Sequence, residues 1–116
     1  MHLEEEAGQT GLYELADGTI LDSEKGILLN GEKTKKLRPQ VIALLKFFLQ
    51  TKNYRLTAEE IDKELWQGKG KPNQLYGVIH HLRESLKGIS SLVVEYRDEY
   101  YCLKMPHSIE KNTEKG

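Results

Sequence analysis

Apolar residues recur at helical spacing over residues 73–86, which read NQLYGVIHHLRESL. Intervals of three and four residues place them on one helical face: Leu75, Val78, Ile79, Leu82 and Leu86. Since each residue turns the helix by about 100°, the opposite face and its flanks hold Asn73, Gln74, Tyr76, Gly77, His80, His81, Arg83, Glu84 and Lys87. Amide, imidazole and guanidinium groups can hydrogen-bond to bases or phosphates. The pattern predicts an amphipathic helix whose polar face suits nucleic acid.

The first third of the chain alternates short apolar runs with turn signals. Strands are expected over residues 13–15, 19–22, 27–29 and 34–37. The Asp-Gly and Asn-Gly pairs between them tolerate the positive φ angles of type I′ hairpin turns. The pattern predicts a four-stranded antiparallel sheet that buries one face and leaves the other in water.

Two more helices are predicted between this sheet and residues 73–86. Residues 41–50 follow Pro39, which suits a first helical turn, and are apolar on nearly every side, which is typical of a central helix. Residues 57–60 form a capping box that opens the second helix. Its buried stripe is Ile61, Leu65 and Trp66. Residues 67–73 then read as a flexible basic loop.

The end of the chain predicts a β-hairpin over residues 92–104, with a polar tip at residues 97–99. The fold class is therefore α+β: an N-terminal four-stranded antiparallel sheet, three helices and a C-terminal hairpin. We expect one domain over residues 12–104, a flexible linker over residues 1–11 and a disordered tail over residues 105–116.

Composition fits one soluble domain, with 116 residues, 38% apolar and 30% charged. No apolar run approaches the ~20 residues of a membrane span, and the acidic start is not a signal peptide. The single cysteine cannot form an internal disulfide, which fits a reducing compartment. A cytoplasmic location is expected.

Charge is unevenly distributed along the chain. Residues 1–37 carry a balance of −4, residues 38–103 carry +2 and residues 104–116 carry +1, which gives the net −1. No carboxylate lies between Glu64 and Glu84. A local basic surface of this kind is compatible with phosphate contacts.

Enzyme and metal chemistry find little support. The sequence has no nucleophile elbow, no paired carboxylates in a cleft-forming context and no cofactor fingerprint, so we expect neither catalysis nor a cofactor. His80 and His81 point about 100° apart and have no ligand partners at zinc spacing, so no metal is expected. The glycines and lysines of residues 68–72 lack the phosphate-loop pattern. Gly77 fits either a close backbone approach to DNA or a tight contact between helices.

The order of sheet, three helices and hairpin is the layout of a winged helix, and four stretches carry a more specific resemblance. LRPQVIALLKFFL (37–49), LTAEEIDKELW (56–66), IHHLRESL (79–86) and VVEYRDEYYCL (93–103) resemble, in order and spacing, the DNA-binding effector domain of OmpR/PhoB-type response regulators. The resemblance extends from about Leu12 to Leu103.

The resemblance implies a winged helix-turn-helix that binds double-stranded DNA and regulates transcription. The third helix would enter the major groove and the wing the minor groove, with copies bound in tandem on direct repeats. The residues that would face bases or phosphates are Asn73, Gln74, Tyr76, Gly77, His80 and His81, with Lys87 on the flank of the helix. Those that would position the DNA backbone or pack beside it are Trp66, whose indole N–H can reach the surface, Arg83 and Tyr101. Arg97 would be the minor-groove probe.

Two further partners follow from the resemblance. The loop between the second and third helices would contact RNA polymerase through Gln67, Gly68, Lys69, Gly70, Lys71 and Pro72. A receiver domain would need ~120 more residues. The signal would then come from a receiver or sensor domain that is fused to this domain or binds it.

Departures from the family pattern keep a second function open. The first helix has Arg38 and Val41 where the family usually has threonine and glutamate, and the wing has Asp98 and Tyr100 where it usually has glycines. The adjacent Asp98 and Glu99 would repel phosphate. The alternative is a winged-helix protein–protein interaction module that has lost DNA binding, which the acidic wing and the −4 balance of the N-terminal sheet favour.

Overall fold

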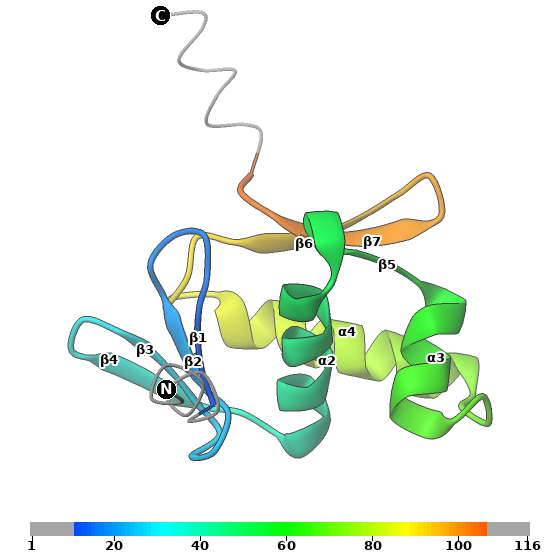
Figure 1. Cartoon of the computed structure of the whole chain (residues 1–116), viewed down its shortest axis with the longest axis horizontal. Coiled ribbons are helices and arrows are strands. Elements are labelled where there is room, and N and C mark those ends of the chain that lie inside the picture. The colour runs from blue at the N-terminus through cyan, green and yellow to red at the C-terminus, as the bar shows by residue number, and fades with distance from the viewer. Residues whose placement is uncertain (1–10, 107–116) are drawn as a thin grey trace, which may run out of the picture.

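A four-stranded sheet, three α-helices and a C-terminal hairpin follow one another along residues 11–106, the part of the chain that the computed structural model describes (Figure 1), and one short strand between the first two helices joins the hairpin in a three-stranded sheet. The predicted α+β class and element order are confirmed. The linker expected over residues 1–11 and the tail expected over 105–116 lie, apart from Gly11, Met105 and Pro106, outside the described residues.

The N-terminal sheet is antiparallel with the order β1-β2-β3-β4. Its strands are β1 (Leu12–Glu14), β2 (Ile20–Asp22), β3 (Ile27–Asn30) and β4 (Lys33–Lys36). They lie within about one residue of the predicted strands. The sheet buries Leu21 and Leu28, which pair with each other across β2 and β3.

The prediction of type I′ turns in this sheet is wrong. At the Asp-Gly and Asn-Gly pairs only the glycines, Gly18 and Gly31, have a positive φ (92° and 65°). Asn30 stays in β3 and pairs with Lys33 across the turn. A strand conformation at Asn30 aims its side chain at the α4–β6 connection, where it donates a hydrogen bond to the Ile89 carbonyl.

The helices are α2 (Pro39–Gln50), α3 (Ala58–Trp66) and α4 (Pro72–Leu86), with a short 3₁₀ turn, η1 (Lys52–Tyr54), after α2. Pro39 occupies the start of α2, as predicted. The predicted capping box is also confirmed: the Glu60 N–H donates to Thr57 Oγ1 at 3.1 Å, and the Thr57 N–H donates to Glu60 Oε1 at 2.8 Å.

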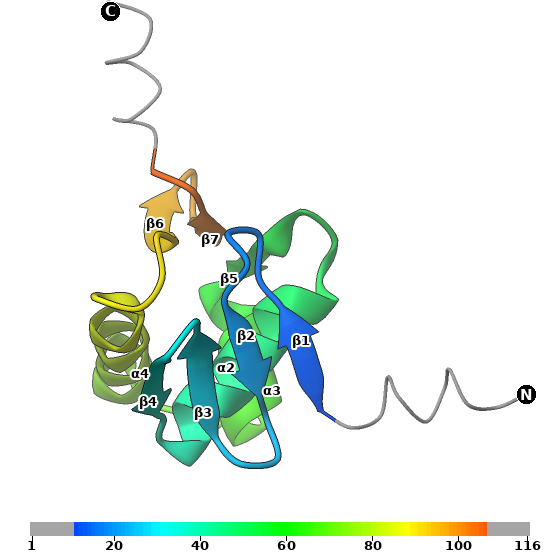
Figure 2. The same cartoon turned by 90° about the vertical axis from the view of Figure 1, so that its left-hand side faces the viewer.

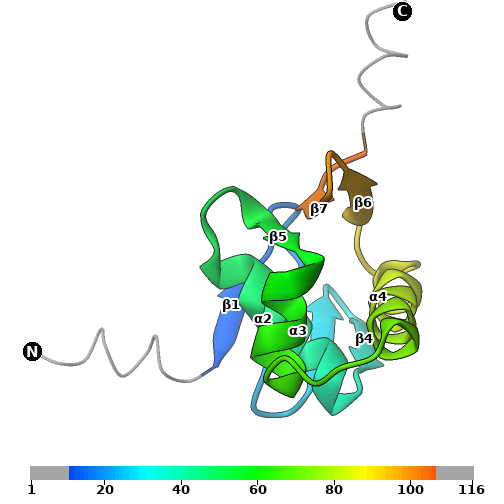
Figure 3. The same cartoon turned by 90° about the vertical axis from the view of Figure 1, so that its right-hand side faces the viewer.

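Helix α2 lies at the centre of the domain. The N-terminal sheet covers one side of it, and α3 and α4 pack on other sides (Figures 2 and 3). Its buried residues are Val41, Leu44, Leu45 and Phe48. This arrangement confirms the central position predicted from the nearly continuous apolar run, because a helix surrounded by other elements has little polar face.

The wing belongs to a three-stranded sheet rather than a hairpin alone. Strand β5 (Arg55–Thr57) joins β6 (Val93–Arg97) and β7 (Tyr100–Lys104) in the order β5-β7-β6. The sequence pattern does not predict β5, because three residues are too few to show alternation. The strand is held by pairing with the distant β7, where buried Leu56 lies opposite buried Tyr101. Within the described residues, no helix has the length and apolar character to cross a membrane.

Candidate nucleic-acid interface

Helix α4 presents an uncovered polar face. The predicted apolar stripe is confirmed, since Val78, Ile79, Leu82 and Leu86 are buried and Leu75 is half-buried. On the other face Asn73, Gln74 and His80 are exposed, and the Tyr76 side chain is 63% exposed. The domain therefore does not bury these side chains against its own elements.

Gly77 lies in the middle of this face. A Cβ atom built at Gly77 would meet no atom of the described residues within 4 Å. The interpretation that this glycine allows a tight contact between helices is therefore wrong. No neighbouring element among the described residues therefore requires a glycine at this position.

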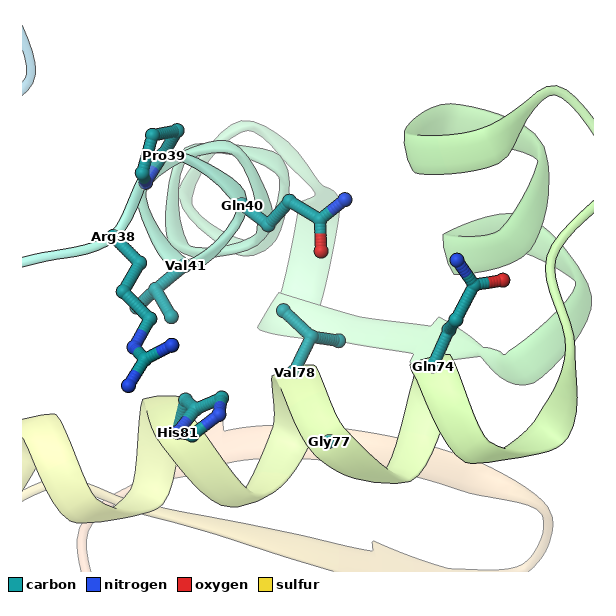
Figure 4. Close-up of a pocket in the computed structure, with 8 residues that line it drawn as sticks. All are labelled: Arg38, Pro39, Gln40, Val41, Gln74, Gly77, Val78 and His81. Atoms are coloured by element: carbon teal, nitrogen blue, oxygen red, sulfur yellow. The ribbon is translucent and has the colours of Figure 1, made fainter.

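A cavity of about 460 Å³ lies beside this face, between the start of α2 and α4. Figure 4 shows the Arg38 guanidinium directed toward the His81 imidazole at one end of it, with Gln40 and Gln74 further along. The first turn of α2 contains no acidic residue and has no side-chain cap. Free backbone N–H groups and the helix dipole at such a terminus favour an anion.

Arg38 was not among the predicted contact residues. In the sequence, Arg38 stands out only as a departure from the family pattern. The available signal was its place directly before Pro39, because a proline at the first helical position marks the residue before it as the N-cap. The structure puts this cation beside His81, although the two residues are far apart in sequence.

Arg83 joins α4 to the wing. Its Nε donates a hydrogen bond of 3.0 Å to the carbonyl oxygen of Val94 in β6, while the side chain stays exposed. Glu84, the next residue, pairs with Lys87 (Nζ to Oε2, 3.1 Å). The Lys87 hydrogen bond and charge lower the pKa of Glu84 below its ordinary value. Lys87 is the residue after α4, so this predicted contact residue is already paired and lies beyond the helix.

Tyrosines line a cleft of about 400 Å³ between α4 and the wing. Tyr76 and Tyr96 are 63% and 57% exposed, whereas Tyr101 is buried, with its ring 4.7 Å from that of Tyr96. Burial, and then the neighbouring tyrosines, raise the pKa of Tyr101, and the charge of Arg83 opposes that rise. Tyr101 therefore packs beneath the surface that the other two tyrosines present.

The Trp66 side chain supports the loop after α3 rather than the surface. Its indole Nε1 is buried and has no hydrogen-bond partner among the described residues. The expectation that this N–H can reach the surface is therefore wrong. A Cβ atom at Gly70 would collide with the Trp66 ring, so the loop backbone lies directly on the indole.

The loop between α3 and α4 is shorter and more tightly held than predicted. Pro72 is already the first residue of α4, so the loop ends at Lys71. The Gly70 N–H donates to Asp62 Oδ1 and the Lys71 N–H donates to Gln74 Oε1, both at 2.8 Å. These bonds tie the loop to the helices on both sides, in place of the flexible connection expected from its glycines.

The tip of the wing carries charges of both signs. Arg97, Asp98 and Glu99 are all exposed, and Asp98 and Glu99 have positive φ angles of 55° and 71°. On the same sheet the guanidinium carbon of Arg55 lies 4.2 Å from the centre of the Tyr100 ring, at cation–π distance. Arg55, which the sequence analysis did not select, therefore adds a second cation near Arg97.

Sites for metal ions are absent from the described ranges, in which no three histidine, cysteine, aspartate or glutamate side chains come together. The rings of His80 and His81 are 5.6 Å apart and tilted by 58°, and no third ligand of these types joins them among the described residues.

The fold of this chain is similar to that of solved structures. No family model matches the sequence, and no curated protein matches it. Among solved structures, the DNA-binding domain of E. coli CadC has a TM-score of 0.68 at 21% identity, covering 84% of this chain and 94% of that domain. The DNA-binding domain of the response regulator AdeR, solved in complex with an intercistronic region, has a TM-score of 0.63 at 15% identity, covering 79% of this chain and 99% of that domain. The chain therefore shares the winged-helix fold of these two DNA-binding domains.

Proposed function

We propose that this domain binds double-stranded DNA at specific sequences and thereby regulates transcription, with α4 in the major groove and the wing in the minor groove. The observation that carries the proposal is the polar face of α4, which stays open around Gly77 in the folded domain. An α-helix fits the B-DNA major groove, where amide and imidazole side chains can distinguish base pairs.

Charge supports the same surface. The chain as a whole is slightly acidic, yet no carboxylate lies between Glu64 and Glu84, and Lys69, Lys71 and Arg83 lie there. Phosphate contacts need such cations, because most of the affinity of a DNA-binding protein comes from the phosphate backbone. The similarity to the CadC and AdeR domains, the second of which was solved with an intercistronic region, adds support.

Base and phosphate contacts would fall to different residues. The exposed Asn73, Gln74 and His80 would face base edges, and Gly77 would let the α4 backbone come close to the DNA. Arg38 and His81, beside the uncapped start of α2, would bind a phosphate next to the groove.

The remaining predicted residues would act around these contacts. Arg97 would probe the minor groove from the wing tip, and Tyr76 would contact the sugar–phosphate backbone at the cleft between helix and wing. Trp66 and Tyr101 would hold those surfaces in place from below, and Lys87 would have to exchange its pair with Glu84 for a phosphate at the end of α4.

Two measurements test this function together. Selection from a random duplex library at low salt should enrich one motif, and the affinity for that motif should fall with salt with a log–log slope of several units. Uniform recovery of all sequences would contradict sequence-specific binding. A slope near zero would contradict phosphate contact.

A protein–protein interaction module is the second candidate, and the exposed Asp98 and Glu99 at the wing tip favour it. Two carboxylates would approach phosphates if the wing enters a groove, and like charges repel. This candidate predicts no saturable duplex binding even at low salt.

We propose roles also for the loop before α4 and for a second copy of the domain on the DNA. Residues 67–72 would contact RNA polymerase, and two domains would occupy direct repeats in tandem. Gln67→Ala, which removes no charge, should then lower promoter activation without changing duplex affinity, and a two-repeat duplex should bind two domains. Activation that stays at the wild-type level in this variant would contradict the polymerase contact.

A further inference from the structure

The connector between α4 and β6, residues 87–92, links the two elements to which the proposed function assigns the groove contacts. The β1–β2 turn of the N-terminal sheet lies beside it (Figure 1). Asp17 in that turn accepts two hydrogen bonds from the connector through Oδ2: one from the Ser90 hydroxyl at 2.9 Å and one from the Ser91 N–H at 2.7 Å. Its Oδ1 accepts the Thr19 N–H at 3.1 Å, which fixes the carboxylate in place.

A second attachment lies one residue earlier in the connector. The Ile89 carbonyl oxygen accepts hydrogen bonds from Asn30 Nδ2 at 2.6 Å and from the fully buried Thr19 Oγ1 at 3.4 Å. The Ile89 residue itself is buried. Because a buried carbonyl without a partner costs free energy, these bonds favour one position of the connector against the sheet.

Strand β4 holds the end of α4 in the same way. Lys35 Nζ donates to the carbonyl oxygens of Glu84 at 3.3 Å and Lys87 at 3.0 Å, and Lys33 Nζ donates to that of Gly88 at 3.4 Å. Cations at the C-terminal end of a helix also interact favourably with its dipole. The N-terminal sheet therefore binds the connector from the last turn of α4 to Ser91.

The wing is attached to α4 on its other side by the bond from Arg83 Nε to the Val94 carbonyl. Between these two attachments, Ser91 stands two residues before the start of β6. We propose that Asp17 is a positioning residue: by holding Ser90 and Ser91, it sets the angle between wing and α4, so that both elements reach one duplex together. This inference rests on the proposed function, in which both α4 and wing contact DNA.

The first experiment compares duplex affinities of Asp17→Ala and Glu14→Ala. Each substitution removes one negative charge from the N-terminal sheet, and Glu14 is an exposed residue of β1. Loss of an acid alone should leave binding to a polyanion equal or tighter. We expect Glu14→Ala to bind as tightly as the wild type or more tightly. Asp17→Ala should bind about tenfold more weakly, because the free energy lost with one or two hydrogen bonds would then be lost from duplex binding.

The conservative variant Asp17→Asn should restore most of the affinity. Its amide oxygen, in the place of Oδ2, can accept both the Ser91 N–H and the Ser90 hydroxyl, whereas its NH₂ group cannot accept the Thr19 N–H. Thermal unfolding establishes that each variant is folded at the temperature of the binding measurement. An Asp17→Ala variant that is folded and binds as tightly as Glu14→Ala would overturn the proposal.

Coupling to the wing separates positioning from a general loss of structure. Arg97→Ala removes the wing contact, so in the Asp17→Ala background it should cost much less affinity than in the wild type. Equal costs in the two backgrounds would mean that Asp17 does not act through the wing.

Amide hydrogen exchange in the free domain tests the same proposal without DNA. We expect Asp17→Ala to speed exchange at Ser91 and along β6, while amides in α2 and α3 keep their wild-type rates. Unchanged rates at β6 would overturn the positioning role. Failure of the wild type to bind any duplex would overturn the proposed function, and the exchange rates would still decide whether Asp17 holds the wing.

Discussion

Asp98 and Glu99 follow one another at the tip of the wing, and both have a left-handed backbone, with φ angles of 55° and 71°. They connect Arg97 to Tyr100, which pair with each other across β6 and β7. Two consecutive positive φ angles are the geometry of the type I′ turn, in which glycine commonly takes the second position. Here a glutamate takes it, at a steric cost of about 1 kcal/mol.

We therefore expect Glu99→Gly to raise the free energy of unfolding by about 1 kcal/mol, since glycine adopts a positive φ without strain. Urea denaturation measures the change. Glu99→Gln is the matched control, because it removes the same charge and keeps the Cβ atom. If repulsion of phosphate matters at the wing, both variants should bind duplex DNA more tightly, yet only the glycine variant should be more stable. Equal stability of the two would show that the turn is not strained.

Gly77→Ala should separate stability from binding. The added methyl group meets no atom of the described residues within 4 Å, and alanine favours a helix over glycine by about 1 kcal/mol. We expect a higher melting temperature and a weaker duplex affinity, because the methyl group would stand where DNA approaches the α4 backbone. Thermal unfolding and a duplex titration on the same sample test this. A variant that gains stability and keeps the wild-type duplex affinity would show that DNA does not approach the α4 backbone at Gly77.

His80 and Arg97 should affect binding in different ways. His80 is exposed on the face of α4, so His80→Ala should change base preference at one or two positions, by about 1–3 kcal/mol for each lost contact. Arg97→Ala should weaken binding to all sequences alike. Affinities measured for the selected duplex and its single-base variants distinguish the two patterns. If neither substitution changes any affinity, the assignment of α4 and wing to the grooves is wrong.

Local patterns in the sequence predicted most of the fold. The capping box at Thr57 and the apolar stripe of α4 depend on residues three or four apart, and the proline at the start of α2 is a signal of one residue. Each can therefore be identified in one short stretch. What could not be predicted depends on pairs that are distant in the chain. Strand β5 exists because Leu56 pairs with Tyr101.

The same limit applies to the candidate site. The spacing of residues in α4 correctly placed the exposed His80 and Asn73 on its outer face. It could not show that Arg38 stands beside His81, because that proximity depends on how α2 crosses α4. Composition also misled: the glycines of residues 67–71 suggested a flexible loop, whereas Gly70 is needed for the close contact with Trp66.

Asp17 should make the stability of the domain depend on acid pH. Burial raises the pKa of its carboxyl group, but hydrogen bonds from Ser91, Thr19 and Ser90 outweigh that effect and lower it below the ordinary value. A lowered pKa in the folded state means that the stabilisation is complete above the unfolded-state pKa of about 3.9 and is lost as the pH falls through the folded-state pKa.

Urea denaturation at a series of pH values from about 6 down to 2 measures this dependence in the wild type and in Asp17→Asn. We expect the wild type to lose more free energy of unfolding than the variant below about pH 4, because the asparagine can still accept from Ser90 and Ser91 but binds no proton. Glu14→Gln, at an exposed position of β1, serves as the control for removal of a carboxylate and should follow the wild-type curve more closely. Parallel curves for wild type and Asp17→Asn would show that the Asp17 carboxylate does not stabilise the folded domain through Ser90 and Ser91.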